Sequence, residues 1–151
     1  MILAVLAPVA GRGIAVRDIP DPVFARGLVG AGMAVTPRSG LQTAVAPVSG
    51  ILTKLLPHAY LVRDKEGPGV LVHLGMDTVR LHGRGFERLA LEGKQILAGD
   101  PVIRWDPAQV EAAGHSAVCA VVAIDGAPDT IRLHAVAIDV EAGDLLFEVD
   151  C

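Results

Sequence analysis

The sequence predicts a mainly β fold, a duplicated β-sandwich or barrel-like single domain with one or two short helices. The chain of 151 residues is 52% hydrophobic but only 3% aromatic, so we expect a core built from Val, Leu, Ile and Ala. Its 17 Gly and 10 Pro residues divide the apolar sequence into short segments, which excludes a long-helix bundle. Two sequence patterns also occur twice, which indicates an internal duplication. No Ser-rich or Pro-rich linker divides residues 1–151, so we expect one domain.

The expected strands are short segments rich in Val and Ile, bounded by Gly, Pro, Asp or Ser. This composition favours strands over helices of the same length. In chain order these segments are residues 2–6, 13–16, 33–35, 44–48, 52–56, 59–62, 70–74, 102–105, 117–124, 133–138 and 145–149.

Two segments carry helical patterns instead. In residues 85–93, Phe86, Leu89 and Ala90 fall on one helical face, and Gly93 supplies a stop. Residues 108–114 follow a proline, which suits the first turn of a helix. We therefore expect one or two short helices among many strands.

The two repeated patterns support a duplicated architecture. The sequence APVAG at 7–11 returns as APVSG at 46–50, and AGD at 98–100 returns as AGD at 142–144. Each pattern combines a turn with a neighbouring strand, so two similar β units are expected to pack together.

Charge, cysteine content and hydropathy exclude several classes of function. The 13 basic and 17 acidic residues give a net charge of −4 without a basic cluster, so no nucleic-acid binding is expected. No apolar run approaches the ~18 residues needed to span a bilayer, and no positively charged signal-peptide start is present. The two cysteines, Cys119 and Cys151, form no CxxC pair. We expect a cytoplasmic protein without direct membrane insertion.

Two of the five histidines lie in the most informative segment, residues 57–78. The apolar runs 59–62 and 70–74 flank the polar sequence DKEGPG, which predicts a β-hairpin. His58 and His73 would then lie on the two adjacent strands, near one end of the hairpin.

The pairing register decides whether these histidines meet. If Arg63 pairs with Val70, Tyr60 lies opposite His73, and His58 is a diagonal neighbour of His73 on the same face. A shift of two in the sum of the paired residue numbers would place the two histidines directly opposite each other. A shift of one would place them on opposite faces.

The residues after His73 suit a reactive imidazole. Gly75 permits close approach and presents a backbone carbonyl near the ring, and Asp77 follows. A carbonyl that accepts from one ring nitrogen fixes the tautomer and leaves the other nitrogen free as a nucleophile. Neutral imidazole is well populated in a cytoplasm, so such a nitrogen can attack phosphorus.

Residues 70–79, VLVHLGMDTV, resemble the active-site motif of the glucose-type enzyme IIA domain of the bacterial phosphoenolpyruvate-dependent sugar phosphotransferase system. The resemblance extends in order from about residue 3 to residue 150. The other segments that carry it are APVAG (7–11), IPDPVF (19–24), VGAGMAV (29–35), VAPVSG (45–50), HA (58–59), LHGRGF (81–86), AGDPVI (98–103) and AGD (142–144).

The resemblance implies a phosphoryl carrier that needs no cofactor. His73 would accept a phosphoryl group from the phosphohistidine of the histidine phosphocarrier protein. It would pass the group to a cysteine of enzyme IIB of an enzyme IIB/IIC sugar permease, which drives sugar uptake with phosphorylation. His58 would be the accessory histidine that stabilises the phosphoryl group, and the carbonyl of Gly75 would orient the ring of His73.

The resemblance also implies a surface that binds both partners. Asp21 and Asp77 would flank the site and meet arginine on the donor, and Val23 and Phe24 would form an exposed hydrophobic rim. One position departs from the family, because Leu56 stands where a Thr is common, two residues before the accessory histidine.

Other functions remain as alternatives. A regulatory binding module that reports its phosphorylation state would use the same exposed face. A zinc-dependent peptidase-like domain would use the His-x3-Asp pattern of His73 and Asp77, but it needs a His-x-His pair that the sequence lacks.

We expect no intrinsic metal, although His58 and His73 could bind Zn²⁺ weakly with a ligand from a partner. The sequence also predicts surface positions for His82, His115 and His134.

Overall fold

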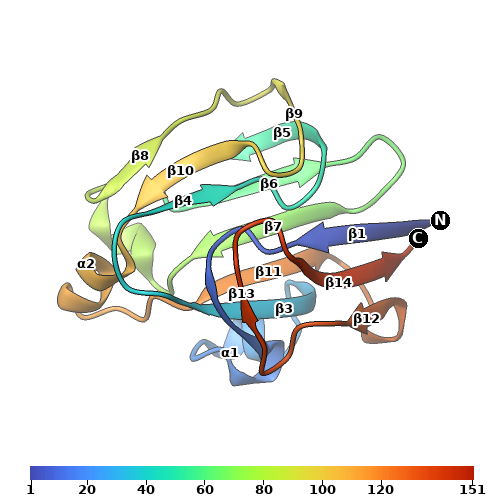
Figure 1. The fold of residues 1–151 in the computed structure, drawn as a ribbon, viewed down its shortest axis with the longest axis horizontal. Helices are drawn as coiled ribbons and strands as arrows, with labels where there is room; N and C mark the ends of the chain where they lie inside the picture. Colours follow the sequence, from blue (N-terminus) through green and yellow to red (C-terminus); the bar gives the residue numbers. More distant parts are fainter.

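Three antiparallel sheets form the protein in the computed structural model, which describes residues 1–151 (Figure 1). The largest sheet has eight strands in the order β13-β2-β3-β11-β7-β6-β5-β9. These strands are β2 (Gly11–Ala15), β3 (Gly30–Pro37), β5 (Gly50–Leu55), β6 (Ala59–Arg63), β7 (Gly69–Leu74), β9 (Gln95–Ile96), β11 (Cys119–Ile124) and β13 (Asp139–Val140).

Two three-stranded sheets lie in front of the large sheet in the view of Figure 1. Their orders are β1-β14-β12 and β4-β10-β8. The strands are β1 (Ile2–Leu6), β14 (Leu145–Asp150), β12 (Ile131–Leu133), β4 (Gln42–Val45), β10 (Pro101–Trp105) and β8 (Phe86–Arg88). The prediction of a mainly β fold with short helices is confirmed.

The helices are short. The α-helices are α1 (Pro22–Ala25) and α2 (Pro107–Ala112), and the 3₁₀ helices are η1 (Val16–Asp18), η2 (Thr78–Leu81) and η3 (Pro128–Thr130). Helix α2 confirms the helix expected near residues 108–114, and its N-cap is Asp106, whose carboxylate accepts from the N–H of Ala108. No helix is long and apolar enough to cross a membrane.

The helix predicted over residues 85–93 is wrong, because part of this segment forms β8. Phe86 pairs with Trp105 of β10, and the N–H of Leu89 donates to the carbonyl of Val102. An isolated helix of about two turns is marginal, whereas pairing with β10 satisfies the backbone and buries apolar surface.

The strand order has an approximate twofold symmetry, as the duplication predicts. Reversing the order of the large sheet exchanges β13 with β9, β2 with β5, β3 with β6 and β11 with β7. The same exchange relates the sheet β1-β14-β12 to the sheet β4-β10-β8. The pseudo-twofold axis therefore passes between β11 and β7, in the middle of the large sheet.

The repeated sequence patterns meet near this axis. The N–H of Leu6 donates to the carbonyl of Pro47, and the N–H of Val45 donates to the carbonyl of Pro8, both at 2.9 Å. Each of these turns also binds one AGD turn through two backbone hydrogen bonds. Ala7 is joined to residues 143–144, and Ala46 to residues 99–100. The two APV turns thus join the halves to each other, and each AGD turn binds the APV turn of its own half.

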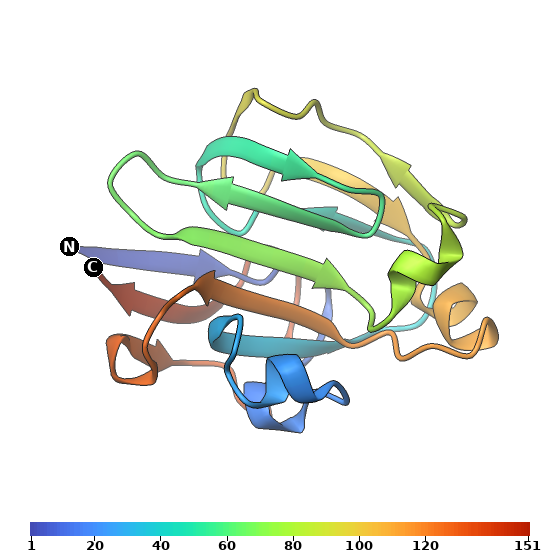
Figure 2. The same cartoon turned by 180° about the vertical axis from the view of Figure 1, so that it is seen from behind.

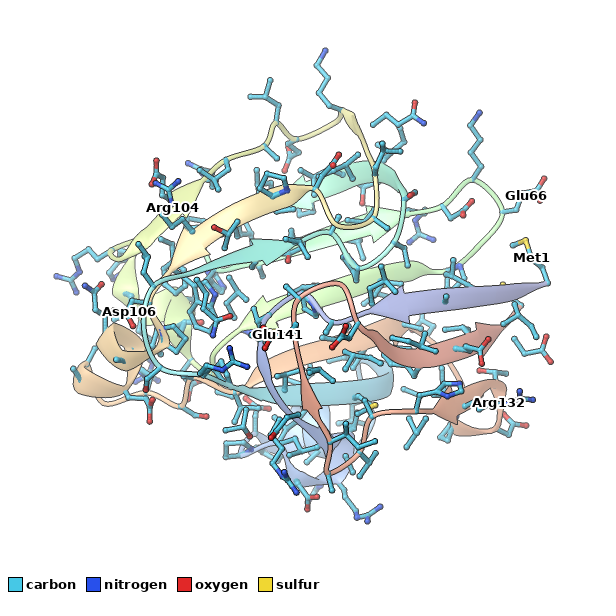
Figure 3. All side chains as sticks on the ribbon, in the orientation of Figure 1. Met1, Glu66, Arg104, Asp106, Arg132 and Glu141 are labelled. Atoms are coloured by element: carbon cyan, nitrogen blue, oxygen red, sulfur yellow. The ribbon has the colours of Figure 1, made fainter.

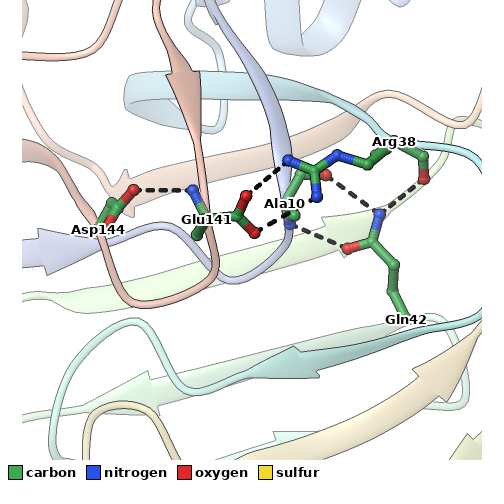
Figure 4. A network of polar contacts seen from close by, with 5 residues as sticks. All are labelled: Ala10, Arg38, Gln42, Glu141 and Asp144. Atoms are coloured by element: carbon green, nitrogen blue, oxygen red, sulfur yellow. Dashed lines mark hydrogen bonds and ion pairs between the residues drawn. The ribbon is translucent and has the colours of Figure 1, made fainter.

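Polar side chains reinforce one of these turns (Figure 4). The Gln42 side chain accepts from the N–H of Ala10 at 2.9 Å and donates to the carbonyls of Ala10 and Arg38. Arg38 forms an ion pair of 2.8 Å with Glu141, whose N–H donates to the carboxylate of Asp144. These contacts tie the β3–β4 connection to the last turn of the chain.

The main core of 30 buried residues contains side chains of all three sheets. A smaller apolar cluster covers the opposite face of the large sheet. Its members are Ile19, Phe24, Ala34, Met76, Ala120 and Val122. Figure 2 shows the segment with η1 and α1 beside β3 at this face. Charged side chains such as Glu66, Arg104 and Arg132 lie at the periphery (Figure 3).

Candidate functional site

His73 lies near the end of β7, on the face of the large sheet that carries the smaller apolar cluster. Its neighbours across the sheet are Ala59 of β6 and Ala120 of β11. These small side chains leave space above the sheet for the imidazole. The ring of Phe24 fills part of that space, with ring centroids 5.4 Å apart. The position of His73 is therefore set by a rigid strand and a packed aromatic ring.

A backbone contact fixes the tautomer of His73. Its Nδ1 lies 2.6 Å from the carbonyl oxygen of Gly75. Because a carbonyl oxygen only accepts, Nδ1 must carry the proton, and in the neutral ring Nε2 keeps its lone pair. The structure thus leaves Nε2 of His73 as the nucleophilic nitrogen.

The loop after His73 is held in place by β11 and its preceding residues. The N–H of Gly75 donates to the carbonyl of Val118, and the N–H of Met76 donates to the carbonyl of Ser116. The buried hydroxyl of Thr78 donates to the carbonyl of Leu74 at 2.8 Å. The Gly75 carbonyl is consequently aimed at His73 by a rigid loop.

Glycine is required at position 75 for two reasons. Gly75 has a φ of +80°, in the left-handed region that favours glycine. A Cβ atom there would lie 2.6 Å from Cγ2 of Thr78 and 2.8 Å from the carbonyl oxygen of Ser116. Any side chain would therefore clash with the residues that hold the loop.

The predicted hairpin forms, but its predicted register is wrong by one residue. Arg63 pairs with Gly69 rather than with Val70, so Tyr60 lies opposite Val72 and Ala59 lies opposite His73. The sequence pattern assigned Gly69 to the turn, whereas it is the first residue of β7.

This shift does not separate the two histidines. His58 precedes β6 and lies in the tight connection after Pro57, where the alternation of a regular strand does not apply. Its carbonyl still accepts from the N–H of Leu74. Its ring meets that of His73 with centroids 5.0 Å apart and planes at 75°. The two histidines are brought together by the β5–β6 turn and not by the register.

A row of aromatic rings continues from His58 into the core. Phe86 lies edge-on to His58 at 6.5 Å, and Trp105 stacks on Phe86 at 6.1 Å. The sequence analysis did not identify Phe86 or Trp105 as site residues, because it placed Phe86 in a helix. The scarcity of aromatic residues was the available signal. Three of the five, Phe24, Phe86 and Trp105, contact one of the two histidines or one another.

Burial lowers the pKa of both histidines below the ordinary value of 6.5. For His58 the causes are desolvation and then the charge of His73. For His73 desolvation dominates, while the hydrogen bond to Gly75 and the charges of Asp21 and Asp77 raise its pKa in part. Both rings are therefore mainly neutral at pH 7, the state in which Nε2 of His73 is nucleophilic.

The four residues expected at the rim differ in exposure. Asp21 is the N-cap of α1, where its carboxylate accepts from the N–H of Val23 at 2.9 Å. Asp77 is exposed in the left-handed region with a φ of 59°. Val23 is 49% exposed, as a rim residue should be. The expected exposure of Phe24 is wrong, because its side chain is only 8% exposed and supports the ring of His73.

The remaining histidines lie outside the site. His82 and His134 are exposed, His115 is half-buried, and His134 contacts Glu148 at 2.6 Å. Leu56 is exposed at the start of the β5–β6 connection. No three His, Cys, Asp or Glu side chains are grouped to hold a metal ion.

Comparison with known proteins identifies relatives of the chain. Residues 3–127 match the family described as phosphoenolpyruvate-dependent sugar phosphotransferase system, EIIA 1. A glucose-specific EIIA component of this system from Staphylococcus epidermidis is 41% identical over 106 residues, which are 69% of this chain and 63% of that protein. The corresponding protein of Haemophilus influenzae is 39% identical over 120 residues, which are 78% of this chain and 71% of that protein.

The chain thus spans less than two thirds of the length of the staphylococcal relative. Among solved structures, glucose permease IIA from Mycoplasma capricolum superposes with a TM-score of 0.90 at 31% sequence identity. That match covers 99% of this chain and 97% of the other. From these matches in sequence and fold, the chain belongs to the EIIA 1 family of the phosphoenolpyruvate-dependent sugar phosphotransferase system.

Proposed function

We propose that the protein is a phosphoryl carrier of the sugar phosphotransferase system, with His73 as the residue that is phosphorylated. The observation that carries this proposal is the contact of 2.6 Å between Nδ1 of His73 and the carbonyl of Gly75, beside the ring of His58. It leaves one unprotonated imidazole nitrogen at the mouth of an apolar site. A cytoplasmic location, as expected from the sequence, is part of this proposal.

In the first transfer, the lone pair of His73 Nε2 attacks the phosphorus of a phosphohistidine on the phosphocarrier protein. The P–N bond of the donor breaks while a P–N bond to His73 forms, so no water or other reactant takes part. In the second transfer, a cysteine thiolate of enzyme IIB attacks the phosphorus. The P–N bond to His73 then breaks and a P–S bond forms.

His58 supports the phosphorylated state. Its neutral ring carries one N–H, and a phosphoryl group on His73 would accept a hydrogen bond from it. The phosphoryl group also brings about 1.5 to 2 negative charges, which favour a protonated His58 and raise the pKa of that ring. Once protonated, His58 binds the phosphoryl oxygens more strongly than its neutral ring would.

The carboxylates at the rim make the phosphorylated site depend on its partners. Asp21 and Asp77 add negative charge next to the position of the phosphoryl group. In the isolated protein this charge destabilises the phosphorylated form of His73. A cationic partner that approaches Asp21 and Asp77 would neutralise this charge during transfer. Val23 offers an exposed apolar contact on the same rim. These features support docking of the histidine phosphocarrier protein and of an enzyme IIB/IIC permease.

The test is phosphorylation in vitro with phosphoenolpyruvate, enzyme I and the histidine phosphocarrier protein. We expect an acid-labile, base-stable phosphoprotein. His73→Ala should abolish labelling, and His58→Ala should still accept phosphate but transfer it slowly to a cysteine acceptor. The exposed His82 supplies the matched control, because His82→Ala should behave like the wild type. Persistent labelling of His73→Ala would refute the assignment.

A further inference from the structure

A cavity of about 550 Å³ lies between the β2–β3 connection and β12. One wall consists of residues of η1 and α1, the floor of the first residues of β3, and the opposite wall of β12 and the turn before it. Figure 1 shows α1 and β12 in the lower part of the view, near β3. The volume lies within the range of about 300–1,000 Å³ that is typical of small-molecule sites.

Two arginines give this cavity a positive charge. Arg17 of η1 and Arg26 at the C-cap of α1 both line it. Neither belongs to any of the four ion pairs of the protein, and no Asp or Glu lines the cavity. Guanidinium groups bind carboxylates and phosphates in a bidentate manner. The cavity therefore favours an anionic group.

The remaining lining is apolar and open. Gly30 and Gly32 line the floor with backbone, and Ile131 and Leu133 present aliphatic side chains from β12. Leu133 is 46% exposed, although it is a large apolar residue. An apolar group bound here would cover this surface and gain from its burial.

The pseudo-twofold axis relates this cavity to the histidine site. The axis exchanges the β2–β3 connection with the β5–β6 connection, which carries His58, and it exchanges β12 with β8. In β8, Phe86 pairs with Trp105, and in β12, Ile131 pairs with Val149. Ile131 is thus the counterpart of Phe86, the ring that contacts His58. One half of the duplicated fold carries His58 in this connection, and the other half carries Arg17 and Arg26 in the corresponding connection.

We infer that the cavity is a binding site for a small organic anion with an apolar body. Arg17 and Arg26 would hold its phosphate or carboxylate group, and Ile131 and Leu133 would contact its apolar part. The inference is independent of phosphoryl transfer at His73. The cavity can therefore fail to bind an anion while the proposed function holds, and it can bind one even if the proposed function is wrong.

The experiment is a titration of the ¹⁵N-labelled protein at fixed ionic strength, followed through its amide resonances. The probes are hexyl phosphate, hexanoate, hexanol and inorganic phosphate. We expect saturable shifts at Arg17, Arg26, Gly32 and Gly126 with at least one of the two amphipathic anions. That anion should bind at least tenfold more tightly than hexanol or inorganic phosphate, and the tighter of the two anions identifies the preferred head group.

Paired variants separate the cavity from general surface charge. Arg17→Gln combined with Arg26→Gln should weaken binding at least tenfold. Arg63→Gln combined with Arg88→Gln should not change it, because these arginines are exposed, lie outside the cavity and also lack an ion-pair partner. The inference is overturned if neither anion gives saturable shifts in the millimolar range, if the shifts occur elsewhere, or if both paired variants bind equally well.

Discussion

Replacement of Gly75 by alanine tests the claim that the loop after His73 is rigid. The matched control is Gly93→Ala, because both glycines have similar left-handed φ values, +80° and +86°. A Cβ at Gly93 would meet nothing within 4 Å, whereas a Cβ at Gly75 would lie 2.6 Å from Cγ2 of Thr78 and 2.8 Å from the carbonyl oxygen of Ser116. Both variants therefore force an alanine into a left-handed backbone conformation, but only Gly75→Ala also brings a methyl group into steric clash with its neighbours.

The expected magnitudes follow from these contacts. A left-handed conformation costs a non-glycine residue about 1–2 kcal/mol, so Gly93→Ala should lower the free energy of unfolding by that amount. Forcing a methyl group into a packed region costs about 1–3 kcal/mol more. Neither neighbour of Gly75 can move easily, because Thr78 is fully buried and hydrogen-bonded and Ser116 contributes backbone. Gly75→Ala should thus lower the free energy of unfolding by about 2–5 kcal/mol.

The assay is urea denaturation of both variants and the wild type, followed by circular dichroism. The effect of glycine on the unfolded chain is common to both substitutions and cancels in their difference. An equal loss of stability for Gly75→Ala and Gly93→Ala would show that the loop yields to the new methyl group. The account of how the Gly75 carbonyl is held toward His73 would then be wrong.

Three further predictions concern the same region. Thr78→Val removes the buried hydroxyl that donates to Leu74 and should lower the free energy of unfolding by about 0.5–1.5 kcal/mol in urea denaturation. Because the pKa values of His58 and His73 are lowered on folding, the unfolded chain binds more protons. The free energy of unfolding should therefore fall as the pH is lowered below the ordinary value of 6.5, by at most about 1.4 kcal/mol per pH unit and histidine. Phe86→Leu removes the ring that contacts His58 and should slow phosphoryl transfer to a cysteine acceptor by about 2- to 12-fold, as expected for about 0.5–1.5 kcal/mol.

Controls for these predictions use exposed residues of the same type. Thr36→Val at an exposed position should leave the stability unchanged, and a loss as large as that of Thr78→Val would contradict the role of the buried hydroxyl. The pH dependence should flatten in His58→Gln and persist in His82→Gln; a profile that is identical in all three proteins would refute its origin. For Phe86→Leu, wild-type transfer kinetics would show that the ring does not position His58.

Local sequence patterns predicted most of the strands better than the contacts between distant segments, although residues 134–138 form no strand. The motif around His73 lies within one strand and its following loop, so the contact between His73 and Gly75 joins residues two positions apart in the sequence. The meeting of His58 and His73 was predicted with an incorrect register, because turn composition does not determine whether Gly69 belongs to the loop or to β7. The contact survives because the β5–β6 turn, and not strand alternation, orients His58.

The burial of Phe24 could not be predicted from its own neighbours. The helix signal was present, since Asp21 is an N-cap and Pro22 occupies the first turn. The space that Phe24 fills is created by Ala34 and Ala120, on strands that pair only in the folded protein. Helix propensity gives no information about such long-range packing.

The aromatic row beside the histidines provides an optical reporter of the site. Trp105 is the single tryptophan of the chain, it is fully buried, and it stacks on the ring that contacts His58. Every photon emitted by tryptophan in this protein therefore originates from one indole, two rings away from His73. We expect the emission of Trp105 to change when a negatively charged phosphoryl group is attached to His73. Phosphoryl exchange with partners could then be timed by stopped-flow fluorescence on the unlabelled wild-type protein.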